Sequence, residues 1–164
     1  IAERFSKIGS VPELHPEDVV TVLERVVLYM DKRTSSKVVI TTHFPDAPVV
    51  VGLVPSLFEW VAENLCKNAV DAMGGAGLID LFVDEDDKFV YVEVKDSGKG
   101  ISKSNFTSVF KPGFTTKERG WGLGLSLAKR IVEEYHKGKI YVKESEVGVG
   151  TTFRIELPKE GVEM

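Results

Sequence analysis

Apolar and polar residues recur with a helical period in the stretch WVAENLCKNAVDAM at residues 60–73. At about 100° per residue, one apolar stripe predicts the face that packs on the core; it holds Val54, Val61, Leu65, Ala69 and Ala72. Asn64, Asn68 and Asp71 form a second row beside that stripe. Because asparagine is a poor helix former, this row predicts a polar cavity against the core, with Glu63 further toward solvent. An ordinary amphipathic helix with a polar edge remains the alternative.

The same patterning predicts the other elements. Helical periods indicate a helix at residues 16–32, begun by Pro16, and another that follows Gly124 and stops at Gly138. Alternation with period two predicts strands at residues 37–42, 49–51, 78–84, 89–95, 139–144 and 151–157. Residues 1–14 start as a helix and break at glycine and proline, which is typical of a helix end and a linker.

Asp96 follows the strand at residues 89–95 and lies on the same face as Val90, Val92 and Val94. A carboxylate that points inward is unfavourable unless it is paired. No cation is adjacent on that face, so the expected partner is a backbone group, a water molecule or a ligand donor.

Residues 102–121 form a long loop that combines cations with aromatic residues. Loops of roughly 20 residues are usually disordered or act as lids, and the aromatic residues favour a lid. We expect three aromatic side chains to pack on the core only when the loop closes over a polyphosphate; they are Phe106, Phe110 and Phe114. The charge of such a ligand would pair with Lys117 and Arg119.

Composition narrows the possible functions. The chain has 164 residues, 43% hydrophobic and 28% charged, which suits one domain with a buried core. Its net charge of −4 argues against a nucleic-acid surface but not against a local phosphate site. The single cysteine, Cys66, excludes an intrachain disulfide and is expected to be a buried thiol. No run approaches the roughly 20 apolar residues that cross a bilayer.

Gly120, Gly122 and Gly124 precede the last predicted helix, and a glycine-rich turn at a helix start binds anions through its free amide groups. It is neither a Walker loop, because no Gly-Lys-Ser/Thr follows, nor a Rossmann turn, because no strand leads into it. Asn68 offers a hard oxygen for Mg²⁺, and Asp96 can accept a hydrogen bond from an exocyclic amine. Together with the loop cations, these groups predict a site for a purine nucleotide and Mg²⁺.

The sequence resembles the catalytic ATP-binding domain of sensor histidine kinases, in the superfamily that also holds the gyrase, Hsp90 and MutL ATPases. Five stretches carry the resemblance: ENLCKNAVDAM at residues 63–73, DSGKGI at 96–101, FKPGFTTK at 110–117, RGWGLGLSLAKRIVE at 119–133 and GVGTTFRIELP at 148–158. The resemblance implies an α/β fold, a two-layer sandwich of the Bergerat type, with a mixed sheet of about five strands covered by three helices. It also implies that residues 1–14 are the remnant of an upstream dimerisation helix and linker, and that residues 15–164 are the catalytic domain, with a lid at about 102–121.

By that resemblance, Asn68 would be the Mg²⁺ ligand, and Asn64 and Lys117 would be catalytic, Asn64 by orienting the phosphates or the attacking group. Asp96 would bind the adenine amine with help from Thr151. The implied ATP-binding residues are Asn64, Asn68, Asp96, Gly98, Gly100, Ile101, Phe110, Thr116, Lys117, Gly122, Leu123, Gly124, Leu125 and Thr151. The chain departs from the usual pattern at Trp121, in place of a threonine, and at Asp71, where many kinases carry a cation.

The resemblance implies a protein histidine kinase whose domain positions ATP·Mg²⁺ for phosphoryl transfer to a histidine on an upstream domain. None of His15, His43 and His136 matches the family's phosphoacceptor pattern, a histidine followed by an acidic residue with proline a few places on. The implied partners are that upstream dimerisation domain, a response regulator receiver domain and a second copy in a homodimer, with no nucleic acid. The implied location is cytoplasmic, and a membrane anchor in upstream segments stays open.

Two alternatives remain. Members of the superfamily that hydrolyse ATP use a glutamate four residues before the Mg²⁺ ligand, where this chain has Asn64, with Glu63 one position away. Hydrolysis is therefore less favoured. A nucleotide-sensing module without catalysis is the other alternative, and the presence of Asn68, Asp96 and the three glycines argues against it.

Overall fold

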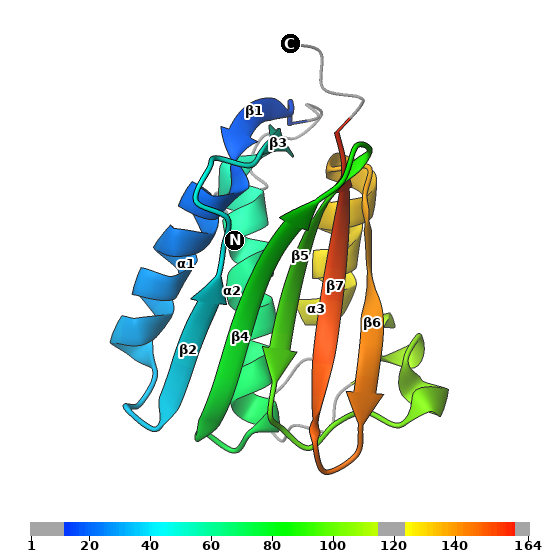
Figure 1. Cartoon of the computed structure of the whole chain (residues 1–164). Helices are drawn as coiled ribbons and strands as arrows, with labels where there is room; N and C mark the ends of the chain where they lie inside the picture. The colour runs from blue at the N-terminus through cyan, green and yellow to red at the C-terminus, as the bar shows by residue number, and fades with distance from the viewer. Residues whose placement is uncertain (1–11, 115–123, 160–164) are drawn as a thin grey trace.

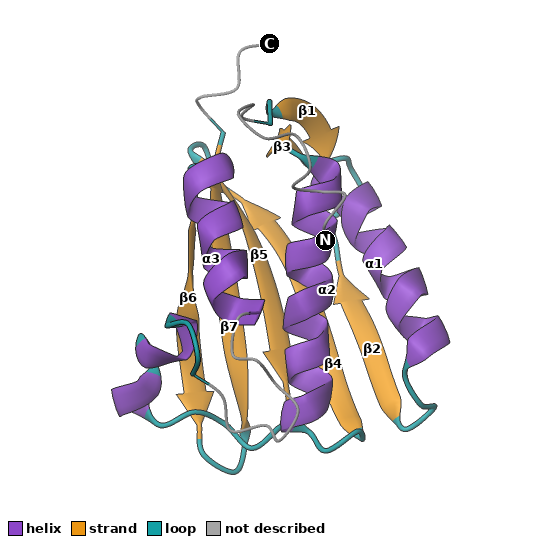
Figure 2. Cartoon of the chain, turned by 180° about the vertical axis from the view of Figure 1, so that it is seen from behind, coloured by secondary structure: helices purple, strands orange, loops and turns teal. Residues whose placement is uncertain are grey.

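The computed structural model describes residues 12–114 and 124–159, and it places the strands in one layer and the helices in the other (Figures 1 and 2). The main sheet consists of β2 (Val38–His43), β4 (Gly77–Glu85), β5 (Phe89–Asp96), β7 (Gly150–Pro158) and β6 (Lys139–Glu146), in that order. β2 and β4 are parallel, and the other neighbours are antiparallel. One face of the sheet is covered by α1 (Val19–Arg33), α2 (Pro55–Ala72) and α3 (Gly124–Arg130). The predicted two-layer α/β sandwich is confirmed.

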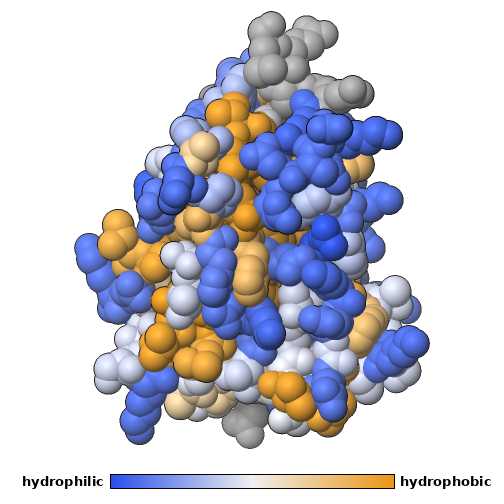
Figure 3. All heavy atoms as spheres, viewed as in Figure 1, coloured by the Kyte–Doolittle hydropathy of each residue, from blue (hydrophilic) through white to orange (hydrophobic). Residues whose placement is uncertain are grey.

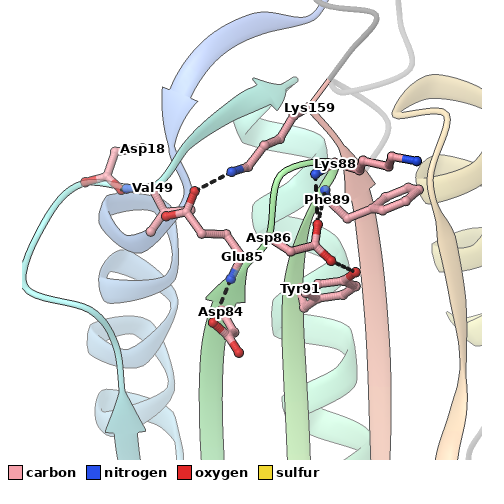
Figure 4. Close-up of polar contacts among 9 residues, drawn as sticks. All are labelled: Asp18, Val49, Asp84, Glu85, Asp86, Lys88, Phe89, Tyr91 and Lys159. Atoms are coloured by element: carbon pink, nitrogen blue, oxygen red, sulfur yellow. Dashed lines mark hydrogen bonds and ion pairs between the residues drawn. The ribbon is translucent and has the colours of Figure 1, made fainter.

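The start of the first helix differs from the prediction. Instead of a helix from Pro16, the short strand β1 (His15–Asp18) pairs antiparallel with β3 (Val50–Leu53) in a separate two-stranded sheet. Asp18 then caps α1, because one carboxylate oxygen accepts a hydrogen bond from the Val20 amide at 3.1 Å. The same oxygen accepts from the Val49 amide at 3.0 Å (Figure 4), so strand pairing and the cap together override the preference of proline for a first helical turn.

α2 packs its predicted stripe on the sheet, and the valines of β5 face it. Val61 and Leu65 are buried, as are Val90, Val92 and Val94. Val54 and Ala72, at the two ends of the stripe, are only half-buried. The organising helix and its core-facing stripe were thus predicted correctly along most of their length.

The expectation that Glu63 points toward solvent is wrong, because its side chain is only 9% exposed. Glu63 lies one turn from both Glu59, which pairs with Arg25 of α1 at 3.4 Å, and Lys67, which lies 5.5 Å from the ring of Tyr29 of α1. It therefore faces α1, on the opposite side of α2 from Asn68. Cys66 is buried as expected, and burial, helped by the Glu63 charge, raises the pKa of its thiol to about 12.

The acidic turn between β4 and β5 has a structural use (Figure 4). The carboxylate of Asp86 accepts hydrogen bonds from the Lys88 and Phe89 amides at 2.9 and 2.8 Å and from the Tyr91 hydroxyl at 2.5 Å. The Tyr91 bond and these amides lower the pKa of Asp86. Lys159, which follows β7, pairs with Glu85 at 2.6 Å, so this turn is also tied to the end of β7.

The first part of the expected lid is ordered as two single 3₁₀ turns, η1 (Lys103–Asn105) and η2 (Ser108–Phe110). Val109 and Phe110 are buried, and the Phe110 ring meets Phe153 of β7 edge-on, with centroids 6.0 Å apart. Phe110 thus packs as part of a short helical turn rather than from a free loop. Any lid is confined to the remainder of the loop, and residues 115–121 lie outside the described residues.

Helix α3 continues into a wider π-turn, η3 (Ile131–Tyr135), before the chain enters β6. None of the helices in the described part of the chain is long and apolar enough to span a bilayer.

Candidate nucleotide site

Most of the predicted site residues come together at one end of the molecule. The second half of α2, the end of β5 and the starts of β7 and α3 all lie at the lower end in Figures 1 and 2. Two contacts fix this arrangement: the Lys99 amide donates to the Ala72 carbonyl at 2.9 Å, and Asp96 pairs with Thr151 across the sheet. Several predicted site residues lie outside the described residues: Thr116, Lys117, Arg119, Gly120, Gly122 and Leu123. The same holds for Trp121 and for residues 1–11 of the predicted helix remnant and linker.

Asp96 is 5% exposed and is held by two backbone amides. Its Oδ1 accepts from Gly98 at 2.8 Å and from Thr151 at 3.3 Å, so a backbone group is the partner that the sequence left open. Burial raises the pKa of the Asp96 carboxyl, and the two amides oppose that rise. Within the described residues Oδ2 receives no hydrogen bond. The second oxygen is therefore an acceptor available to a ligand donor, as an adenine amine would require.

Ser145, in β6, belongs to the site although no motif marks it. Its hydroxyl accepts from the Ile101 amide at 2.7 Å and lies 2.7 Å from the Thr151 hydroxyl and 3.0 Å from the Gly150 carbonyl. It thereby ties the loop that follows Asp96 to β7. Only the cross-strand register of β6 and β7, which pairs Ser145 with Thr151, reveals this role.

Two glycines are required by close contacts within the site. Gly100 has a φ of +79°, and a Cβ there would lie 2.3 Å from the Glu146 carbonyl oxygen. A Cβ on Gly124, the first residue of α3, would lie 2.7 Å from Oδ1 of Asn64. The start of α3 and the polar row of α2 therefore touch, as the shared site predicts. Leu125, next along α3, is half-buried.

Asn64 and Asn68 provide the hard oxygens that Mg²⁺ prefers. The Nδ2 of Asn64 is buried and has no hydrogen-bond partner among the described residues, which is unusual for a buried amide. This donor is therefore available to an acceptor atom of a ligand. Across residues 12–114 and 124–159, no group of three or more His, Cys, Asp or Glu side chains could hold a metal alone. The donor set therefore fits Mg²⁺ that is bound jointly by an asparagine oxygen, phosphates and water, not an all-protein metal site.

The three histidines lie away from this site. His15 starts β1, at the end of the molecule opposite the Asp96 end of β5 (Figure 1). His43 ends the edge strand β2, where it pairs in register with Phe82 of β4. His43 pairs with Asp80 at 2.9 Å and stacks on Phe82. His136 is 1% exposed, and burial lowers the pKa of its ring. None of them is presented as a phosphoacceptor next to the polar row of α2.

Residues 54–161 match the family described as histidine kinase-, DNA gyrase B- and HSP90-like ATPases, which is more than half of the chain. The chain therefore belongs to this ATPase family. Among solved structures, the catalytic domain of histidine kinase ThkA is 30% identical, with a TM-score of 0.80 over 90% of this chain and 97% of that one. Within the family, the chain is an ATP-binding catalytic domain of the histidine kinase type.

Two curated proteins that are similar in sequence to this chain are also kinases. Sporulation kinase A of Bacillus subtilis is 37% identical over 121 residues, and sensor histidine kinase ZraS of Escherichia coli is 42% identical over 104 residues. These segments cover 74% and 63% of this chain but only 20% and 22% of the two relatives. A structure of ThkA in complex with the response regulator TrrA is 28% identical, with a TM-score of 0.79 over 96% of this chain and 45% of that one.

Proposed function

We propose that this domain positions ATP·Mg²⁺ so that a histidine on a separate, upstream domain of the same protein attacks the γ-phosphate. The observation that carries the proposal is the Oδ2 of the buried Asp96, to which no residue of 12–114 or 124–159 donates, held beside Thr151 at the end of the sheet that meets the polar row of α2. An adenine amine on Asp96 directs the rest of a nucleotide toward α2 and the start of α3.

In this proposal Asn68 binds Mg²⁺, Asn64 orients the phosphates or the attacking imidazole, and Lys117 neutralises charge on the transferred group. Gly98, Gly100 and Ile101 form the floor of the base site, and Gly124 and Leu125 present backbone to the phosphates. Phe110, which packs on Phe153, would anchor the start of the lid, and Thr116, Gly122 and Leu123 complete the set as residues of the lid and its hinge. When bound, Mg²⁺ would neutralise phosphate charge, so that catalysis consists mainly of positioning.

The proposed partners are the upstream dimerisation and phosphoacceptor domain, with residues 1–14 as its last turns and linker, and a response regulator receiver domain. The complex of ThkA with TrrA supports the second partner, since that kinase shares this domain. The whole protein would then act as a homodimer, with residues 15–164 in the cytoplasm.

Hydrolysis of ATP by water is less well supported. A general base would need a carboxylate beside the Mg²⁺ ligand, and Asn64 occupies that place. Glu63, the nearest candidate, is buried on the α1 side of α2.

The test is incubation of the chain with γ-labelled ATP and Mg²⁺, alone and with the parent protein's upstream histidine-bearing segment. We expect the nucleotide to bind, no stable label on the chain alone, and acid-labile label on the added segment. Acid-labile label on His15, His43 or His136 would contradict the proposal. Steady phosphate release without the segment would favour the ATPase alternative, and binding with neither reaction would favour the sensing module.

A further inference from the structure

His136 lies outside the nucleotide site but is bonded at both ring nitrogens. It follows the π-turn η3, its Nδ1 lies 3.0 Å from the Ile131 carbonyl oxygen, and its Nε2 lies 3.1 Å from the Val54 amide nitrogen. A backbone amide is always a donor, so Nε2 is the acceptor and Nδ1 carries the proton. These partners fix the neutral Nδ1–H tautomer.

Val54 is the N-cap residue of α2, and its side chain makes no capping hydrogen bond. Pro55 follows and has no amide hydrogen, so His136 supplies a partner from another element. The imidazole also packs against Phe58, one turn further along α2, with ring centroids 5.8 Å apart. His136 thus fastens the chain just after α3 and η3 to the beginning of α2.

A second contact joins these helices at the other end of α3, where Gly124 touches Asn64. The two helices run in opposite directions, with the end of the α3 segment beside the start of α2 (Figure 2). From Val54 to Asn64 is ten steps and from Gly124 to His136 twelve, about 15 and 18 Å of ideal α-helix. The π-turn fits more residues into a given length than an α-helix does, which accounts for the longer segment of chain on the α3 side. His136 stabilises that turn, because both its backbone amide and its ring donate to the Ile131 carbonyl.

We propose that His136 is a positioning residue for the phosphate side of the nucleotide site. By fixing the end of the α3 segment on the start of α2, it sets how far along α2 the start of α3 lies, and so holds Gly124 against Asn64. The adenine side depends on Asp96 and Thr151 of the sheet, which His136 does not contact. This inference rests on the proposed function, which places the adenine base at Asp96 and Thr151 and the phosphates between α2 and the start of α3.

Three substitutions separate the two bonds of the ring. His136→Phe keeps a ring beside Phe58 and removes both bonds. His136→Gln places an amide oxygen where Nε2 lies and retains an acceptor for the Val54 amide. His136→Asn reaches only as far as Nδ1, so it can bond Ile131 but not Val54. Val83→Ala in β4, which removes buried volume far from α3, is the control for a loss of stability alone.

The measurement is calorimetric affinity for adenosine and for a non-hydrolysable ATP analogue with Mg²⁺, at a temperature where every variant is folded. We expect His136→Phe and His136→Asn to bind the analogue about tenfold more weakly, from the loss of one or two hydrogen bonds that hold the helices. Adenosine affinity should not change, and His136→Gln should restore most of the analogue affinity.

Equal weakening of adenosine and the analogue, or the same pattern in Val83→Ala, would show that His136 serves stability alone and overturn the inference. A His136→Gln variant that binds the analogue as weakly as His136→Asn would also overturn it. This comparison tests the inference even if His136→Phe does not fold. Failure of the unsubstituted chain to bind either ligand would instead refute the proposed function.

Discussion

At the scale of single residues, Asp96 shows how a functional group can work against the stability of its own fold. The carboxylate is buried with two amide donors on one oxygen and none, within the described residues, on the other. Desolvation raises the pKa of the carboxyl in the folded chain, so folding penalises the charged form relative to the unfolded chain.

We therefore expect Asp96→Asn to separate binding from stability. Asparagine keeps an oxygen for the Gly98 and Thr151 amides, so the fold is preserved. The substitution removes a carboxyl whose charged form is penalised by burial, so it should leave the melting temperature equal or higher. ADP affinity should fall about 10- to 100-fold, because a buried charged acceptor for the base amine is lost.

Calorimetric titration with ADP and a thermal melt of the same sample provide both readouts. Asp87→Asn makes the same chemical change at an exposed position of the turn between β4 and β5, away from the site, and serves as the control. A melting temperature several degrees lower together with the loss of affinity would mean that Asp96 is structural.

His136 predicts that the stability of the fold depends on pH. Burial lowers the pKa of its ring in the folded state below the value of about 6.5 for an unfolded histidine. The unfolded state therefore binds the proton more readily, so stability is fully present above pH 6.5 and is lost as the pH falls toward the folded pKa. Urea unfolding between pH 8 and pH 5 should show this decline.

The matched comparison is His136→Gln, which has no titrating ring. The variant should show a shallower decline of the unfolding free energy over the same pH range. Parallel curves for the two proteins would mean that His136 does not carry the dependence.

The residues that sequence reasoning identified are those with a local pattern. Asp96 was found because three valines precede it on one strand face, and Asn64 and Asn68 because amides are unusual beside an apolar helical stripe. Glu63 was misplaced because helical period alone does not say where a neighbouring helix packs. Ser145 and His136 were missed because their partners, Ile101 and Val54, are far away in the sequence.

At the scale of elements, the boundaries were predicted well where the period is long and less well where a tertiary contact decides. α2 and the β4–β5 hairpin follow their patterns closely. The helix predicted from Pro16 begins instead at Val19, since β1 pairs with β3. The turns of residues 103–110 have no sequence period and form where Val109 and Phe110 meet the core.

Asp18 is the residue that sets the start of α1, so replacing it should measurably change the stability of the fold. We expect Asp18→Ala to lower the free energy of unfolding by about 1–2 kcal/mol, because both the cap and the bond to Val49 are lost. Asp18→Asn retains the capping oxygen and should lose much less. Urea unfolding of both variants tests this, and equal losses would mean that charge, not the cap, is what matters.

At the scale of the whole molecule, the sheet order is what builds the site. β5 lies between β4 and β7, which places Asp96 next to Thr151 although 55 residues separate them. The turn between β6 and β7 then closes on the loop after Asp96, through the Gly148 amide and the Lys99 carbonyl at 2.8 Å. No local pattern encodes this order: the family resemblance implied a mixed sheet of about five strands, and the order of those strands was not predicted.

The most direct test is an NMR titration of the isotope-labelled chain with ADP and Mg²⁺, in which the backbone amide shifts are followed residue by residue. Saturable shifts should concentrate in the second half of α2, the loop that follows β5 and the start of β7, at Asn64, Asn68, Gly98, Gly100 and Thr151. The β1–β3 pair should not respond, nor should the open face of the sheet, which no helix covers and which is turned toward the viewer in Figures 1 and 3. An absence of saturable shifts, or the largest shifts on that open face, would contradict a nucleotide site between α2, α3 and the end of β5.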